Sequence, residues 1–240
     1  TKMKKFDHLT KLKVLDCACC PVRKINLPHI EELYCEFTKL KKLNHLTTLR
    51  ILNCVASDVY LVPVSLVELY CNYVIQNLNE LINLEILGYN ESVGLDLCNI
   101  YLPKLKKLYC YDTDIAEINH LTTLEELHCS SSAISYIDLP LLKVLDCSFT
   151  EIKTVTHLKT LEILIYKDRP LIDYEGLNLK RLIDNVFDYE DYIDENSPFR
   201  KFNLALDSDL EFEPASDSEF EFESEFESDF EFESNSKSDS

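Results

Sequence analysis

The chain has 240 residues and a formal net charge of −19, with 43 acidic side chains against 24 Lys and Arg. Most of this charge belongs to residues 203–240, which carry fourteen acids and one Lys, whereas residues 1–183 are nearly neutral. Because the sequence supplies no evident cluster of Lys and Arg to displace phosphate counterions, we expect no nucleic-acid partner. There is no apolar run of transmembrane length, and the first residues given do not read as a secretory h-region, so we expect no membrane partner either.

From residue 12 to residue 184 the pattern L-x-x-L-x-C recurs ten times. The first copy is Leu12, Leu15 and Cys17, and the sixth positions of the ten copies follow one another at intervals of about 18 or 19 residues. These positions are Cys17, Cys35, Cys54, Cys71, Tyr89, Cys110, Cys129, Cys147, Tyr166 and Asp184. A short unit cannot bury its apolar face alone, so the repetition predicts a solenoid of stacked units.

Each copy predicts one short strand, and stacking the copies in parallel predicts a single curved sheet. The return path between strands is too short for a full helix, so extended stretches and single turns are expected there. Prolines agree with this, because Pro28, Pro63, Pro103 and Pro140 each lie just before an expected strand, where a missing N–H is tolerated.

The pattern resembles the leucine-rich repeat, L-x-x-L-x-L-x-x-N-x-L, over roughly residues 6–190. Cys replaces Leu at the sixth position, and a hydroxyl such as Thr38 or Ser57 replaces the usual Asn at the ninth. Short Cys-containing repeats of this kind resemble those of leucine-rich-repeat proteins of large amoebal DNA viruses and of some bacteria. The resemblance implies a leucine-rich-repeat solenoid with its parallel β-sheet on the concave face and short turns on the convex side.

Three regions are expected along the chain. Residues 1–184 form the solenoid of about ten repeats, and residues 185–202, rich in Tyr, Phe and Asp, cap its open end. Residues 203–240 alternate acids with Phe, so their charges repel and they lack the apolar residues for a core. We therefore expect a disordered acidic C-terminal tail.

The cysteines and histidines are predicted to be structural. Seven Cys share one repeat position, where Cys acts as a small apolar filler, and this usage favours a reducing cytoplasm, the host cell cytoplasm if the protein is viral. A row of thiols does not converge on one point, so no metal is expected. His8, His45, His120 and His157 also share one repeat position and are too far apart to form a site. Without a Gly-rich phosphate loop or a nucleophile motif, neither catalysis nor a cofactor is expected.

The candidate binding site is a set of aromatic residues expected to face outward from the concave sheet: Tyr34, Phe37, Tyr70, Tyr73, Tyr109, Tyr111 and Phe149. Aromatic side chains on a rigid exposed sheet are typical anchors of protein interfaces. Nearby charges change sign along the sheet, from Glu31 through Lys106 to Glu125 and Lys143. The alternative is that the aromatics only stack on one another and strengthen the sheet.

The sequence therefore predicts a monomeric, non-catalytic scaffold that binds a protein through its concave face. One alternative is a factor that binds basic, histone-like proteins through the acidic tail. Its apolar anchors would be Phe220, Phe222, Phe226, Phe230 and Phe232. Another is a targeting subunit of a larger effector or of a ubiquitin-ligase-type assembly.

Overall fold

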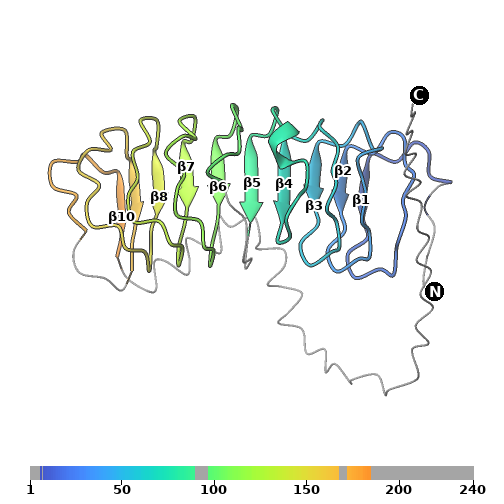
Figure 1. Ribbon diagram of the computed structural model, residues 1–240, viewed down its shortest axis with the longest axis horizontal. Helices are drawn as coiled ribbons and strands as arrows, with labels where there is room; N and C mark the ends of the chain where they lie inside the picture. The colour runs from blue at the N-terminus through green and yellow to red at the C-terminus, as the bar shows by residue number, and fades with distance from the viewer. Residues whose placement is uncertain (1–5, 7, 90–96, 168–171, 185–240) are drawn as a thin grey trace, which may run out of the picture. The chain divides into compact units, whose positions relative to one another are not determined.

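The computed structural model describes residue 6 and residues 8–89, 97–167 and 172–184. These residues form a ten-stranded parallel sheet in which the strands follow one another in sequence order (Figure 1). The strands are β1 Val14–Asp16, β2 Glu32–Tyr34, β3 Ile51–Asn53, β4 Glu68–Cys71, β5 Ile86–Tyr89, β6 Lys107–Tyr109, β7 Glu126–His128, β8 Val144–Asp146, β9 Ile163–Ile165 and β10 Arg181–Ile183. The predicted strand in every repeat and the predicted solenoid are confirmed.

The register of the sheet follows the second Leu of each pattern. Leu15 pairs with Leu33, Leu33 with Leu52, and the same pairing continues along the sheet to Leu182 on β10. Because side chains alternate across a strand, this row points into the core while its neighbours on either side point outward. The apolar core is thus one continuous column under the sheet.

Each Cys of the pattern lies two residues after the second Leu, on the same side of the sheet, and it is buried at all seven positions. None of the ten cysteines, all of which lie within the described ranges, forms a disulfide. Burial raises the pKa of the Cys17 and Cys71 thiols to about 12, so they remain protonated and apolar at neutral pH. The prediction that these residues fill the core is confirmed.

A turn with the same conformation follows most strands. Two residues after the Cys position the backbone adopts a positive φ, at Cys19, Phe37, Ala56, Asp112, Ser131 and Phe149. One residue later a hydroxyl closes the turn, as where Thr38 Oγ1 donates to the Cys35 carbonyl at 2.7 Å. Ser57, Thr113 and Thr150 make the same bond, so the hydroxyl takes over part of the role of the usual Asn.

The return path is extended, as predicted. Within the described ranges its only helix is the 3-10 turn η1, Leu78–Glu80, and none is long and apolar enough to cross a membrane. His45 Nε2 lies 2.8 Å from the Ile25 carbonyl oxygen, and His120 and His157 contact the equivalent carbonyls of their neighbouring repeats. These three histidines tie adjacent repeats together, which confirms a structural role.

Candidate functional site

Two rows of side chains cover the outer face of the sheet, one on each side of the buried Leu row. The first row, from β1 to β10, is Val14, Glu32, Ile51, Glu68, Ile86, Lys107, Glu126, Val144, Ile163 and Arg181. The second row is Asp16, Tyr34, Asn53, Tyr70, Gly88, Tyr109, His128, Asp146, Ile165 and Ile183. Together these rows form the outer face.

In the N-terminal half of the outer face, Tyr34 and Tyr70 are half-buried. Each donates its hydroxyl to the Glu two residues before it, Tyr34 to Glu32 at 3.3 Å and Tyr70 to Glu68 at 3.4 Å. Burial and then the neighbouring Glu carboxylate raise the pKa of both phenols, so they stay neutral. Each hydrogen bond stays within one strand, so each hydroxyl is tied to a carboxylate of its own repeat.

In the C-terminal half, Tyr109, His128 and Asp146 lie side by side on β6, β7 and β8. The rings of Tyr109 and His128 stack, with centroids 4.9 Å apart. His128 is 1% exposed and Asp146 is fully buried. Nε2 of His128 lies 3.2 Å from Glu126 Oε1, and Nδ1 lies 3.8 Å from Asp146 Oδ2. Burial alone lowers the His128 pKa, but the two carboxylates outweigh it and the pKa is raised.

Glu126 joins this cluster to its neighbours. Its carboxylate accepts hydrogen bonds from the Tyr109 hydroxyl at 2.7 Å and from His128, and it pairs with Lys107 Nζ at 2.8 Å. Burial raises the Glu126 pKa, but these donors outweigh it and hold the pKa at about 2. With both ring nitrogens of His128 facing carboxylates, the arrangement stabilises a charged imidazolium rather than activating a nucleophile.

The structure separates the seven predicted aromatic residues. Tyr34 and Tyr70 lie on the outer face, and Tyr111 follows β6 with its ring centroid 6.1 Å from that of His128. The expected exposure of Tyr109 is wrong, because only 4% of this residue is exposed. Its burial accompanies the stacking on His128 from the next strand, a contact that its own repeat does not encode.

Three other predicted positions are off the strands. Phe37 and Phe149 occupy the turn residue with positive φ, at 55° and 57°, and Tyr73 follows the end of β4. The expectation that they face outward from the strands is therefore wrong, although all three are exposed. The predicted tail anchors from Phe220 to Phe232 and the predicted cap at residues 185–202 lie outside the described residues.

The predicted change of charge along the sheet has a structural explanation. Side chains that enter the strands form ion pairs between adjacent repeats, as Lys13 does with Glu31 and Lys106 with Glu85, each at 2.8 Å. The pairs Lys143–Glu125 and Lys180–Glu162 continue the series. These exposed charges therefore match one another across the solenoid and need no partner to explain them.

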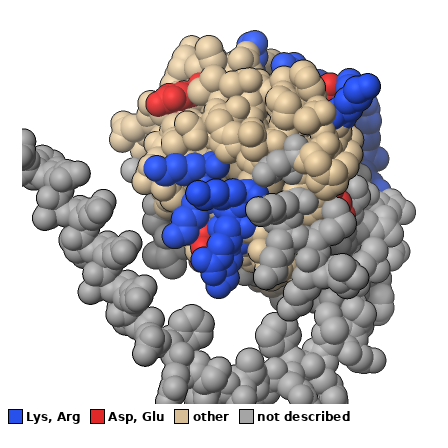
Figure 2. All heavy atoms as spheres, turned by 90° about the vertical axis from the view of Figure 1, so that its right-hand side faces the viewer, with Lys and Arg blue, Asp and Glu red and all other residues tan. Residues whose placement is uncertain are grey.

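A second surface was missed in the sequence. The return path of the first three repeats lines a groove of about 870 Å³, whose cations are Arg23, Lys24, Lys39, Lys41 and Lys42. We call it the basic groove; viewed from that end of the solenoid, one group of Lys and Arg lies below the centre of the face, apart from others at its upper edge (Figure 2). The expectation that no basic cluster exists is therefore wrong. Stacking creates the cluster, because Lys39 N–H donates to the Val22 carbonyl and Tyr60 N–H to that of Lys41.

A signal for the basic groove was present in the repeat pattern. Aligning the first two repeats on Cys17 and Cys35 places Arg23–Lys24 in register with Lys41–Lys42.

Among the residues that the structure describes, no group of His, Cys, Asp and Glu is arranged to hold a metal ion.

Comparison with known proteins gives a fold but no sequence relative. No protein-family model matches the chain, and no curated protein matches it in sequence. Among solved structures it is similar to an internalin, InlF, from Listeria monocytogenes, with a TM-score of 0.58 and 21% identity over 74% of this chain and 64% of that chain. It is also similar to internalin C2 from the same organism, with a TM-score of 0.52 and 20% identity over 64% of this chain and 80% of that one.

This chain thus spans less than two thirds of the InlF chain. At such low identity the likeness concerns architecture alone. Together with the ten parallel strands in sequence order, it identifies the fold of this chain as a leucine-rich-repeat solenoid.

Proposed function

We propose that the N-terminal half of the outer face, β1 to β4, binds a protein partner and has no catalytic role. The observation that carries this proposal is the pair Tyr34 and Tyr70, two half-buried rings on a rigid sheet, each fixed by a carboxylate of its own strand. Solenoids present extended surfaces of this type to macromolecular partners, and Tyr is enriched among the residues that dominate binding energy.

Mutual stacking does not account for these two rings. They lie on β2 and β4 with Asn53 of β3 between them, so roughly 10 Å separates their strands. Aromatic pairs interact at centroid distances of about 4.5–7 Å. The stacking alternative fits Tyr109, whose ring stacks on that of His128 on the adjacent strand.

The charge of this half indicates the chemistry of the partner. Asp16, Glu32 and Glu68 lie in the two rows, and β1 to β5 contribute no Lys or Arg to them. Val14, Ile51 and Ile86 in the first row add apolar surface. The complementary partner is a protein surface that combines Lys or Arg with apolar side chains.

The test is quantitative affinity capture from cell extract with the full chain, followed by measurement of Kd for the captured protein. Tyr34→Ala with Tyr70→Ala should weaken binding by more than about 2 kcal/mol, roughly 30-fold, because both anchors are removed. Circular dichroism should show that the double variant is folded.

The matched control is Tyr101→Ala with Tyr136→Ala, which removes two exposed tyrosines from the return path. This variant should bind like the wild type. Unchanged affinity in the folded Tyr34/Tyr70 variant would overturn the proposal. Loss of the partner on deletion of residues 203–240 alone would instead favour the acidic tail as the binding element.

A further inference from the structure

We propose that the basic groove binds an acidic peptide segment of a partner protein. The groove lies on the return path of the first three repeats, between residues 23 and 60, and shares no residue with the two rows of the outer face. It is therefore a second interaction surface, and it does not depend on the function proposed above.

The cations of the groove differ from the other lysines of the solenoid. Lysines at the strand entrances form ion pairs with Glu from an adjacent repeat, as Lys13 does with Glu31. Within the described part of the chain, none of the five groove cations has an ion-pair partner, and all five are exposed. With Asp58 as the single acid in the lining, the formal charge of the groove is +4. Gathering like charges is unfavourable by itself, and a bound anionic segment would offset that cost.

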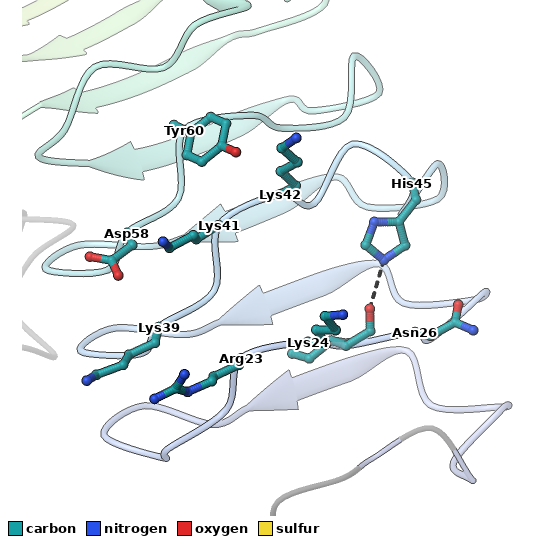
Figure 3. A pocket seen from close by; sticks show the side chains of 10 residues that line it. Arg23, Lys24, Asn26, Lys39, Lys41, Lys42, His45, Asp58 and Tyr60 are labelled. Atoms are coloured by element: carbon teal, nitrogen blue, oxygen red, sulfur yellow. Dashed lines mark hydrogen bonds between the residues drawn. The ribbon is translucent and has the colours of Figure 1, made fainter. Parts of the chain in front are cut away.

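The geometry suits an extended ligand. Arg23 and Lys39 reach out in the same direction from neighbouring turns of the chain (Figure 3). Lys42 Nζ lies 5.7 Å from the centre of the Tyr60 ring, while Ile25 is buried in the wall of the groove, where its carbonyl contacts His45. Positive charge is thus spread along two stacked segments about 4.8 Å apart, residues 23–24 and 39–42, instead of converging on one point, and the third segment adds Asp58 and Tyr60. Several carboxylates along a peptide match this spread, and Tyr60 offers apolar surface to a side chain between them.

A nucleic acid fits the groove less well. Its phosphates continue at one charge per roughly 1.7 Å of duplex, well beyond the groove and over a body that is nearly neutral in a chain of net charge −19. A short acidic peptide ends where the positive charge ends. The observations therefore favour the peptide.

A distant repeat shows that the framework does not require these cations. Residues 33–49 match residues 108–124 at a constant offset of 75, and the buried positions agree closely: Leu33/Leu108, Cys35/Cys110, Thr38/Thr113, Leu46/Leu121 and Leu49/Leu124. His45 and His120 make the same backbone contact. Yet Lys39, Lys41 and Lys42 correspond to Asp114, Ala116 and Glu117. The same buried framework thus carries opposite charge at its surface.

This correspondence supplies a charge-swap variant, Lys39→Asp with Lys41→Ala and Lys42→Glu, whose residues the fold already accommodates elsewhere. Its control is Lys104→Glu with Lys153→Ala and Lys159→Glu, which changes the net charge equally but at exposed sites outside the groove. The probe is a fluorescent synthetic peptide of alternating Glu and Phe, with a Gln-for-Glu version as neutral control. Fluorescence anisotropy reports binding at low and at physiological salt.

The full chain and a chain ending at residue 202 are both titrated, because residues 203–240 have the same acidic and aromatic composition as the probe. We expect the acidic peptide to bind one or both chains, the neutral peptide to bind at least tenfold more weakly, and the charge swap to weaken binding at least tenfold. The control variant and Tyr34→Ala with Tyr70→Ala should bind the peptide like the wild type, which keeps this test separate from that of the outer face.

Three results would overturn the proposal. One is no binding to either chain, and another is equal binding by the charge-swap variant and its control. The third is tighter binding of a single-stranded DNA of equal charge, or displacement of the peptide by millimolar inorganic phosphate, since either would assign the groove to phosphate chemistry.

Discussion

The two halves of the outer face use the same Tyr position in different ways. On β2 and β4 the hydroxyl of Tyr34 or Tyr70 bonds to a Glu of its own strand, whereas on β6 the Glu position is Lys107 and the Tyr109 hydroxyl bonds to Glu126 of the next strand. The first arrangement gives half-buried rings whose hydroxyls bond within their own strand, and the second gives a buried network of stacked rings and paired charges. The replacement of Glu by Lys107 in the first row therefore accompanies the difference between the two halves. We propose the N-terminal half as a partner surface, whereas the C-terminal half is occupied by internal contacts.

The largest effect should come from the framework that both halves share. Cys54 and Cys129 are buried at equivalent positions of β3 and β7 repeats, so Cys→Asp at either should cost more than about 4 kcal/mol by burying an unpaired charge. Cys→Val should be mild at both sites, because Val is an apolar residue of similar size. Urea unfolding measures the difference. A mild Asp variant at only one site would show that the two halves differ in their core as well as on their surface.

An intermediate effect should separate the two halves. Asp146→Asn keeps the size of the side chain but leaves the His128 imidazolium with one carboxylate, so we expect a loss of about 3 kcal/mol in the free energy of unfolding. Glu68→Gln is the same chemical change in the N-terminal half, where it should cost less than about 1 kcal/mol. Equal costs in urea unfolding would remove the distinction between a buried network and a solvated pair.

The smallest effect is a pH dependence of the His128 cluster. The raised pKa of His128 gives stability that is complete below the ordinary value of 6.5 and is lost as pH rises through the folded pKa. The lowered pKa of Glu126 gives stability that is complete above its ordinary value of 4.5 and is lost as pH falls toward about 2. The stability difference between wild type and Asp146→Asn should therefore shrink as pH rises above 6.5. An NMR titration that places the His128 pKa below 6.5 would contradict this assignment.

Sequence periodicity was enough to predict the strands, since Leu15 or Cys17 must be buried in any solenoid with this repeat. It was not enough to predict which aromatic rings are accessible. Tyr109 looks like Tyr34 within its own repeat, but its surroundings depend on Glu126 and His128 of the neighbouring repeat. Phe37 was misplaced for another reason: its position in the repeat adopts positive φ, a conformation that Phe does not signal.

The basic groove was missed because its charges are modest in any one repeat. Arg23 and Lys24 form one short pair, and Lys39, Lys41 and Lys42 form a group of three about one repeat later. Only stacking brings the two segments together. Comparing exposed positions between repeats, in addition to buried ones, would have predicted it.

The left-handed turn has a consequence for how the array unfolds. Ordinary side chains are strained at positive φ, and here the next repeat holds the turn in place: the Cys19 N–H donates to the Glu36 carbonyl, and the Ser131 N–H to that of Ser148. A repeat that loses its C-terminal neighbour therefore loses the bond that maintains its own turn. Each repeat is therefore stabilised by its neighbour. Unfolding should begin at an end of the array and proceed inward one repeat at a time, as in a one-dimensional chain of coupled units.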